Sequence, residues 1–141
     1  MTTRAPAGIR RQVIYRAGSC CEYCLIHQDF AASSHQIDHV IAEKHGGKTT
    51  LENLALSCSI CNRRKGSDIS STDPETGAIR PLFNPRTQMW TDHFRLDDVR
   101  IVGLTPEGRT TVRLLKLNSF ERLTERGPLI GAKRFPPRPL A

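Results

Sequence analysis

The chain has 141 residues, of which 38% are hydrophobic and 6% aromatic, and its formal net charge is +7. This length suits one domain or one compact core with extensions, and the modest apolar content predicts that something besides hydrophobic burial supports the core. The positive charge favours an acidic partner such as nucleic acid, and no stretch approaches the ~20 apolar residues of a membrane-spanning helix. We therefore expect a cytoplasmic protein that does not contact a membrane.

Four of the five cysteines form two Cys-x-x-Cys pairs, Cys21 with Cys24 and Cys58 with Cys61. Because no secretory signal precedes them, pairs with this spacing indicate metal binding rather than a disulfide framework. Four thiolates can close a tetrahedral site on zinc, which would contribute roughly 10 to 16 kcal/mol to folding at neutral pH. The alternative is that these cysteines are redox-active or incidental. Cys20 would widen the first pair to Cys-x-x-x-Cys, and we expect it to be a free thiol.

The first half of the chain predicts a short helix and then a strand, strand, helix unit. Residues 1–8 look like a loose terminus, and Gly46-Gly47 marks a flexible connection between the two strands. The expected elements are a helix over 9–17, strands over 36–41 and 54–57, and a helix over 58–65 that ends at Gly66.

The second half predicts an extension of strands and helices. Residues 67–85 contain several turn signals and are expected to form a long linker or excursion. Further elements are one or two strands within 90–102, a helix that starts at Thr105-Pro106 with Val112, Leu114 and Leu115 buried, and a last helix that Asn118-x-x-Glu121 opens and Gly127-Pro128 ends. Residues 133–141 form a basic, Pro-rich tail that we expect to be unstructured.

Asp38 and His39 are candidates for phosphodiester chemistry. Hydrolysis needs a deprotonated water and positive charge where the transition state becomes negative, and a histidine can take the proton while a carboxylate holds a divalent cation. Neighbouring residues on a regular strand point to opposite faces, so the pair can serve one site only if the strand ends or bends there. The alternative is an exposed pair at a strand edge.

Asn62 directly follows Cys61 on the expected helix, so a zinc ion on Cys61 would also fix the direction of the Asn62 amide. Asp38 and Asn62 supply hard oxygen ligands, which suit Mg²⁺ or Mn²⁺ better than zinc. Taken alone, Asn62 could equally be a polar residue on an exposed helix face.

Several other residues are expected to support this candidate site. Asn53 precedes the second strand, where its side chain can hold the preceding loop and thereby orient His39. Phosphate contacts are expected from Arg63, Arg64 and Lys65, and His45 is a further candidate for nucleic-acid binding. The alternative for the basic run is that it only complements the helix dipole.

In this order, five motifs resemble the HNH endonuclease family, which has the ββα-metal fold, over about residues 20–68. They are Cys21-x-x-Cys24, Ile37-Asp38-His39-Val40, Gly46-Gly47, Asn53-Leu54 and Cys58-x-x-Cys61-Asn62-x-x-Lys65-Gly66. The resemblance implies that His39 is the general base, that Asp38 and Asn62 bind the catalytic metal, and that Asn53 orients the loop. It also implies that the four paired cysteines hold a structural zinc.

We accordingly predict an α+β protein with a small ββα-metal core, a four-cysteine zinc site, an N-terminal helix and a C-terminal strand and helix extension. The expected segments are a basic N-terminal segment (1–19), the nuclease core (20–68), an extension packed on it (69–132) and the tail (133–141). The predicted function is metal-dependent cleavage or nicking of DNA with Mg²⁺ or Mn²⁺, and a homodimer would allow both strands to be cut. The alternative is a catalytically silent, zinc-stapled module that binds nucleic acid.

Overall fold

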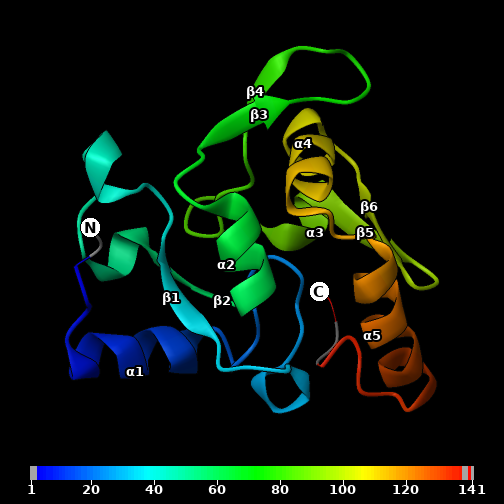
Figure 1. Ribbon diagram of the computed structural model, residues 1–141, viewed down its shortest axis with the longest axis horizontal. Coiled ribbons are helices and arrows are strands. Elements are labelled where there is room, and N and C mark those ends of the chain that lie inside the picture. Colours follow the sequence, from blue (N-terminus) through cyan, green and yellow to red (C-terminus); the bar gives the residue numbers. More distant parts are fainter. Residues whose placement is uncertain (1–2, 138–139, 141) are drawn as a thin grey trace. The chain divides into compact units, whose positions relative to one another are not determined.

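The computed structural model describes residues 3–137 and 140, and the chain divides into two compact units (Figure 1). The first unit comprises the residues up to Ile69 together with Asn84–Thr87, and the second comprises Ser70–Phe83 and the residues from Gln88 onward. Both units combine helices with two-stranded antiparallel sheets, which confirms the α+β class. Among the helices of the described residues, none has the length and apolarity needed to cross a bilayer.

The first unit contains the expected helix followed by a strand, strand, helix unit. Its elements are α1 (Ala7–Arg16), β1 (Gln36–His39), β2 (Leu54–Ser57) and α2 (Ser59–Lys65), with 3₁₀ turns at Gln28–Phe30, Glu43–His45 and Leu51–Asn53. β1 and β2 are antiparallel, so that Asp38 lies opposite Ala55 and His39 opposite Leu54. β1 ends at His39, two residues earlier than the sequence predicts, and this end of the strand is where the candidate site begins.

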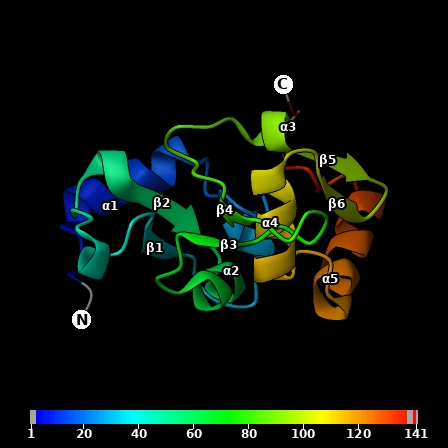
Figure 2. The same cartoon turned by 90° about the horizontal axis from the view of Figure 1, so that it is seen from above.

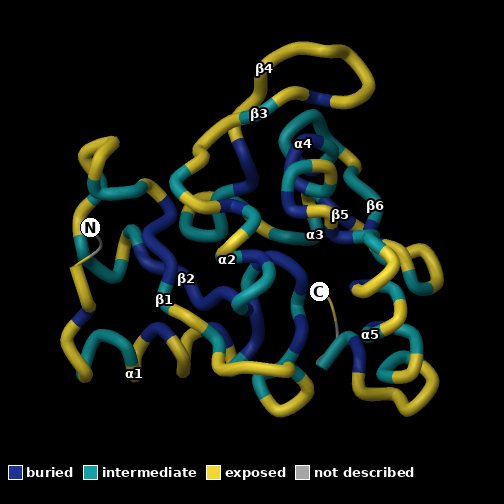
Figure 3. Tube along the Cα trace, in the orientation of Figure 1, coloured by how far each residue is buried: buried dark blue, intermediate teal, exposed yellow. Residues whose placement is uncertain are grey.

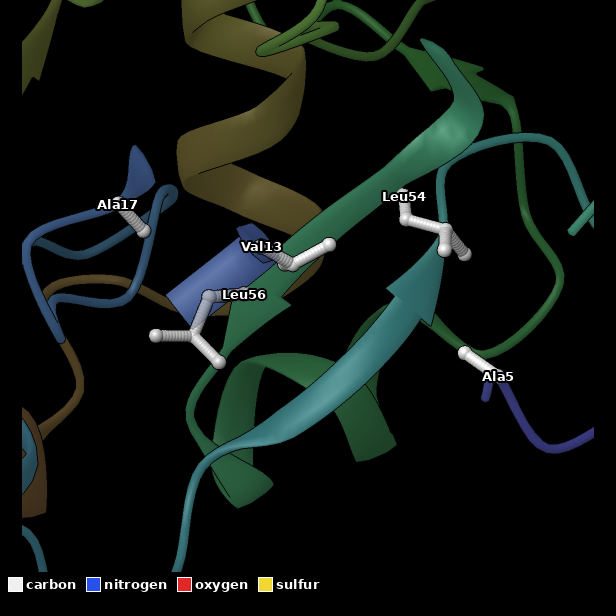
Figure 4. Packing of buried hydrophobic residues seen from close by; sticks show 5 residues of the cluster. All are labelled: Ala5, Val13, Ala17, Leu54 and Leu56. Carbon is white, nitrogen blue, oxygen red and sulfur yellow. The ribbon is translucent and has the colours of Figure 1, made fainter. Parts of the chain in front are cut away.

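The core of the first unit lies between α1 and β2. Val13 and Ala17 of the helix segment pack with Leu54 and Leu56 of the strand, and all residues of β2 are buried (Figures 3 and 4). Ala5 joins this cluster and is only 5% exposed. The prediction of a loose terminus over residues 1–8 is therefore wrong at Ala5, because a small apolar side chain there fills a gap in the core.

Both ends of α2 follow from its sequence. At the start, the Cys58 sulfur accepts a hydrogen bond from the Cys61 N–H. At the end, Gly66 has φ = +53°, a left-handed conformation that glycine adopts at little cost, and its N–H donates to the Asn62 carbonyl. The helix is thus fixed at one end by a cysteine of the metal motif and at the other by glycine.

In the second unit, part of the predicted linker or excursion forms a hairpin. Its elements are β3 (Ser70–Thr72), β4 (Ile79–Pro81), α3 (Trp90–His93), β5 (Phe94–Asp97), β6 (Arg100–Gly103), α4 (Pro106–Leu115) and α5 (Phe120–Gly131). α4 packs against β6 and against the β3–β4 hairpin (Figure 2). Asp73, in the hairpin turn, is fully buried and accepts hydrogen bonds from the Arg109 guanidinium at 3.1 and 2.8 Å. This contact with α4 explains why a polar, turn-rich stretch is ordered.

Both α4 and α5 differ from expectation in detail. Thr105 caps α4 as predicted, but the side chains buried along that helix are Thr110, Thr111 and Leu115 rather than Val112 and Leu114. α5 is not capped by Asn118 as the sequence predicts. The Asn118 side chain instead bonds the backbone of Ile101 on β6.

α5 does not end at Gly127-Pro128 but continues to Gly131 with Pro128 inside it. Proline removes one helical hydrogen bond, yet the Ala132 N–H still bonds the Pro128 carbonyl beyond it. In the tail, Phe135 is buried, and the Arg126 guanidinium lies 5.5 Å from the centre of its ring. The tail is therefore partly packed, whereas residues 138, 139 and 141 lie outside the described residues.

Candidate active site and metal centre

The four paired cysteines form one buried cluster in the first unit. The sulfurs of Cys21, Cys24, Cys58 and Cys61 all lie within 4.8 Å of one another, and those of Cys24 and Cys58 are 3.7 Å apart. Four sulfurs at ~2.3 Å from one zinc ion would be about 3.8 Å apart at the edges of a tetrahedron. The donor set and its spacing therefore fit zinc.

The surroundings of the cluster also suit a metal. The Cys24 and Cys61 N–H groups donate to the sulfurs of Cys21 and Cys58, each at 3.4 Å. Burial, together with hydrogen bonds between the thiols, raises the pKa of Cys21 well above its usual value. Four buried thiolates would need a bound cation to stabilise their negative charge. Cys20 stays outside the cluster as predicted, and its sulfur lies 3.3 Å from the Gly18 carbonyl oxygen.

Asp38, His39 and Asn62 line one cleft with a volume of about 310 Å³, which Glu43 also lines. The end of β1 at His39 removes the strict alternation of a strand, and both members of the Asp-His pair therefore reach the same cleft. This arrangement brings together, from a strand and a helix, the three residues expected to carry the chemistry.

Asp38 is 5% exposed and is held by two side chains from other elements. The Tyr23 hydroxyl, between the first two cysteines, donates to Asp38 Oδ2 at 2.8 Å, and Lys65 Nζ lies 3.2 Å from the same oxygen. Burial raises the pKa of Asp38, while the Lys65 charge and the two hydrogen bonds act in the opposite direction. Tyr23 was not anticipated from the sequence, although its place inside the metal motif was visible there.

Lys65 does not have the position expected of a phosphate contact. Its side chain is 2% exposed, and besides Asp38 it donates to the His39 carbonyl at 3.2 Å. The prediction for Lys65 is thus corrected, because its ammonium group faces inward on α2 and not toward solvent. Arg63 is exposed and Arg64 half-buried.

His39 is 7% exposed, and its Nε2 lies 2.9 Å from the Thr49 hydroxyl. Asn62, on α2, donates a hydrogen bond from its amide nitrogen to Gln36. That bond uses the nitrogen and not the oxygen that a hard cation would need. His45 is exposed, and its Nε2 lies 3.1 Å from the Ser67 carbonyl oxygen.

Asn53 holds the loop between the strands. Its Oδ1 accepts from the Ile41 N–H, and its Nδ2 donates to the carbonyls of Ile41 and Lys48, all at 2.9 Å. The loop passes so close to itself at Gly47 that a Cβ atom there would lie 1.7 Å from the Ile41 carbonyl oxygen. Glycine is required at that point, and the Asn53 contacts fix the chain directly after His39.

Comparison with known proteins agrees with the predicted resemblance. Residues 21–68 match the family model described as HNH endonuclease. The chain is 26% identical over 127 residues to the Septu protein PtuB of Bacillus thuringiensis, a match that covers 89% of this chain and 47% of that protein. The chain therefore spans about half the length of this relative. No solved structure matches the chain significantly.

Proposed function

We propose, from the HNH endonuclease domain that residues 21–68 form, that this chain hydrolyses DNA phosphodiester bonds with one Mg²⁺ or Mn²⁺ and one structural zinc. The observation that carries the proposal is the convergence of Asp38, His39 and Asn62 on one cleft. A module that only binds nucleic acid does not need a carboxylate, an imidazole and an amide at one point.

His39 acts as the general base. When Nε2 carries the proton and donates a hydrogen bond to the Thr49 hydroxyl, Nδ1 is the basic nitrogen of the neutral ring and can accept a proton from the attacking water. Thr49 then holds the orientation of the ring, and Asn53 fixes the loop that follows His39. General-base catalysis of this kind contributes roughly 10² to 10⁴ in rate.

Asp38 and Asn62 are the residues that would hold the catalytic cation. Their oxygens suit Mg²⁺ or Mn²⁺, and the cation would supply positive charge for the transition state and for the leaving oxygen. Other side chains would position the DNA by binding its phosphates. Arg63 and Arg64, at the end of α2, and His45 would contact the DNA backbone, whereas Lys65 balances the charge of Asp38.

A single active site cuts one strand, so the simplest product is a nick. Cleavage of both strands would need a homodimer or two successive events. The decisive experiment is cleavage of supercoiled plasmid by zinc-loaded protein with Mg²⁺, with Mn²⁺ or with EDTA. We expect nicking only with added divalent metal, and a loss of about 10² to 10⁴ in rate for His39→Ala. Cleavage at the normal rate by His39→Ala, with zinc and fold intact, would overturn the mechanism.

A zinc-stapled module that binds nucleic acid without cutting it is the second candidate. The observation in its favour is that Tyr23 and Lys65 already bond the carboxylate of Asp38. Binding of a cation there requires the Lys65 ammonium group to share or leave this carboxylate. If wild type and His39→Ala both retard the plasmid on a gel and neither cuts it with any metal, this second candidate replaces the first.

A further inference from the structure

A second cavity of about 280 Å³ adjoins the candidate active site. It is lined by Thr3, Arg4, Ala5, Arg10, His35, Gln36, Ile37 and His39. Ile37 and His39 also line the active-site cleft, so the two cavities meet along β1. We propose that this second cavity binds a backbone phosphate that neighbours the one being cut, a role that rests on the proposed action on nucleic acid.

The charge of the cavity supports an anionic ligand. Arg4 and Arg10 contribute two guanidinium groups, and none of its lining residues is acidic. Within the described part of the chain, neither guanidinium forms an ion pair. Elsewhere in the same unit, Arg86 does form an ion pair, with Glu22. Two unneutralised guanidinium groups on one concave surface attract phosphate, whose oxygens they can bind in pairs.

His35 provides a second, independent observation. Its Nε2 lies 2.9 Å from the Ile26 carbonyl oxygen, and since a carbonyl only accepts, Nε2 is the donor. Its Nδ1 is buried and has no hydrogen-bond partner in the described residues. Buried polar atoms are nearly always paired, and the residue that carries this orphaned nitrogen also lines the basic cavity. Since Nε2 already carries a proton, Nδ1 can donate to a phosphate oxygen only in the imidazolium form of the ring.

The segment that carries Arg4 is held at both sides. Ala5 is buried in the core beside Val13 and Leu54, and the Thr3 hydroxyl donates to Glu43 Oε2 at 2.8 Å. The Thr3 N–H donates to the other oxygen of the same carboxylate. Arg10 lies on the first turns of α1, where its N–H bonds the Pro6 carbonyl. The backbone of the site is therefore preorganised, and the conformational entropy lost on binding an anion is mainly that of the two arginine side chains.

The test compares binding and cleavage in matched variants. Arg4→Gln and Arg10→Gln remove the two charges singly and together, and Arg11→Gln is the control because Arg11 is exposed and lines neither cavity. Affinity for a fluorescent DNA duplex is measured by anisotropy over a range of salt without added divalent metal, after zinc content and circular dichroism have confirmed the fold. Plasmid cleavage with Mg²⁺ gives KM and kcat for the same proteins.

We expect the double variant to reduce the slope of log affinity against log salt by about 2, and each single variant by about 1. KM should rise and kcat should change little, while Arg11→Gln stays close to wild type. If the double variant and Arg11→Gln give equal slopes and equal KM, the subsite is refuted, and cleavage by wild type still stands. If wild type binds and the slopes change as expected but no metal supports cutting, the subsite stands and the nuclease proposal fails.

Discussion

The side chains of Tyr23, Asp38 and Lys65 join three elements at one carboxylate. The phenol comes from the turn between the first pair of cysteines, the carboxylate from β1, and the ammonium group from the end of α2. Buried charges are tolerated when they are paired and hydrogen-bonded, and this one has both a cation and a hydroxyl. In the proposed mechanism the same two neighbours determine how readily Asp38 binds a metal, so the four-cysteine motif and the proposed catalytic site are linked through one hydroxyl.

Tyr23→Phe is expected to keep the fold and the zinc but to weaken use of the catalytic metal. The change removes the hydrogen bond to Asp38 Oδ2 and leaves the Lys65 contact, so stability should fall by about 1 to 3 kcal/mol. Without the hydroxyl, the Asp38 carboxylate is less well oriented, and half-maximal cleavage should need more Mg²⁺. A metal titration of nicking rate measures this. Tyr15→Phe is the control, because Tyr15 is 88% exposed, and an identical Mg²⁺ dependence for Tyr23→Phe and wild type would contradict the role.

Asn53→Ala should lower the rate of cleavage even under conditions where the variant is fully folded. Three hydrogen bonds to the loop after His39 are lost, and the carbonyls of Ile41 and Lys48 lose their donors. Asn53→Asp should be similarly poor although it has nearly the same shape, because a carboxylate cannot donate to those carbonyls. The measurement is nicking rate at a temperature where circular dichroism shows each variant fully folded. Lys48→Ala, which leaves the Lys48 carbonyl in place, should cleave normally; full activity in Asn53→Asp would argue against the role.

At the level of elements, local signals predicted the first unit well. Glycine ends α2, a short apolar run marks β2, and paired cysteines at fixed spacing identify the four-cysteine cluster, because each of these patterns acts within a few residues. The contacts of Tyr23 and Lys65 with Asp38 join residues 15 and 27 positions apart, and no local pattern encodes them. The prediction that Lys65 contacts phosphate was wrong for this reason. Its neighbours in sequence are exposed or half-buried arginines, and nothing local distinguishes it from them.

The second unit was predicted less well because its order depends on distant contacts. β3 and β4 have only three residues each and no apolar alternation, and their turn is fixed by Arg109 of α4, 36 positions away. At Pro128, too, a distant contact overrides the local signal, but here it keeps a helix going where the sequence predicts its end. A residue that usually ends a helix lies inside α5, where the neighbouring Arg126 binds the carbonyls of Val99 and Leu117 and holds the helix in place.

The hairpin contact predicts an acid sensitivity for the second unit. Hydrogen bonds from Arg109 hold the pKa of Asp73 below its usual value, so the group contributes stability above its unfolded pKa of ~3.9 and loses it as pH falls toward the folded pKa. Wild type should therefore melt at a higher temperature than Asp73→Asn at neutral pH, and the gap should shrink below about pH 4. Thermal melts followed by circular dichroism between pH 7 and pH 2 test this. A gap that does not change with pH would refute the assignment.

At the scale of the whole molecule, the four-cysteine cluster draws all of its ligands from the first unit. Zinc on four thiolates contributes roughly 10 to 16 kcal/mol, as much as the whole stability of a typical domain at about 5 to 15 kcal/mol. The first unit should therefore unfold without zinc, whereas the second has its own core around Phe83, Phe94 and Ile101. Cys58→Ser is expected to abolish the amide protection of β1, β2 and α2 in hydrogen exchange and to leave that of β5, β6 and α4.

Cys20→Ser is the matched control, because Cys20 is also a buried cysteine of the first unit but stays outside the cluster. It should bind one zinc ion and show the exchange pattern of wild type. If the amides of both units instead exchange at the same rate in Cys58→Ser, the two units unfold as one cooperative body and zinc stabilises the entire chain. If it leaves β1, β2 and α2 protected, hydrophobic packing of α1 on β2 is sufficient to hold the first unit, and zinc is not what defines its fold.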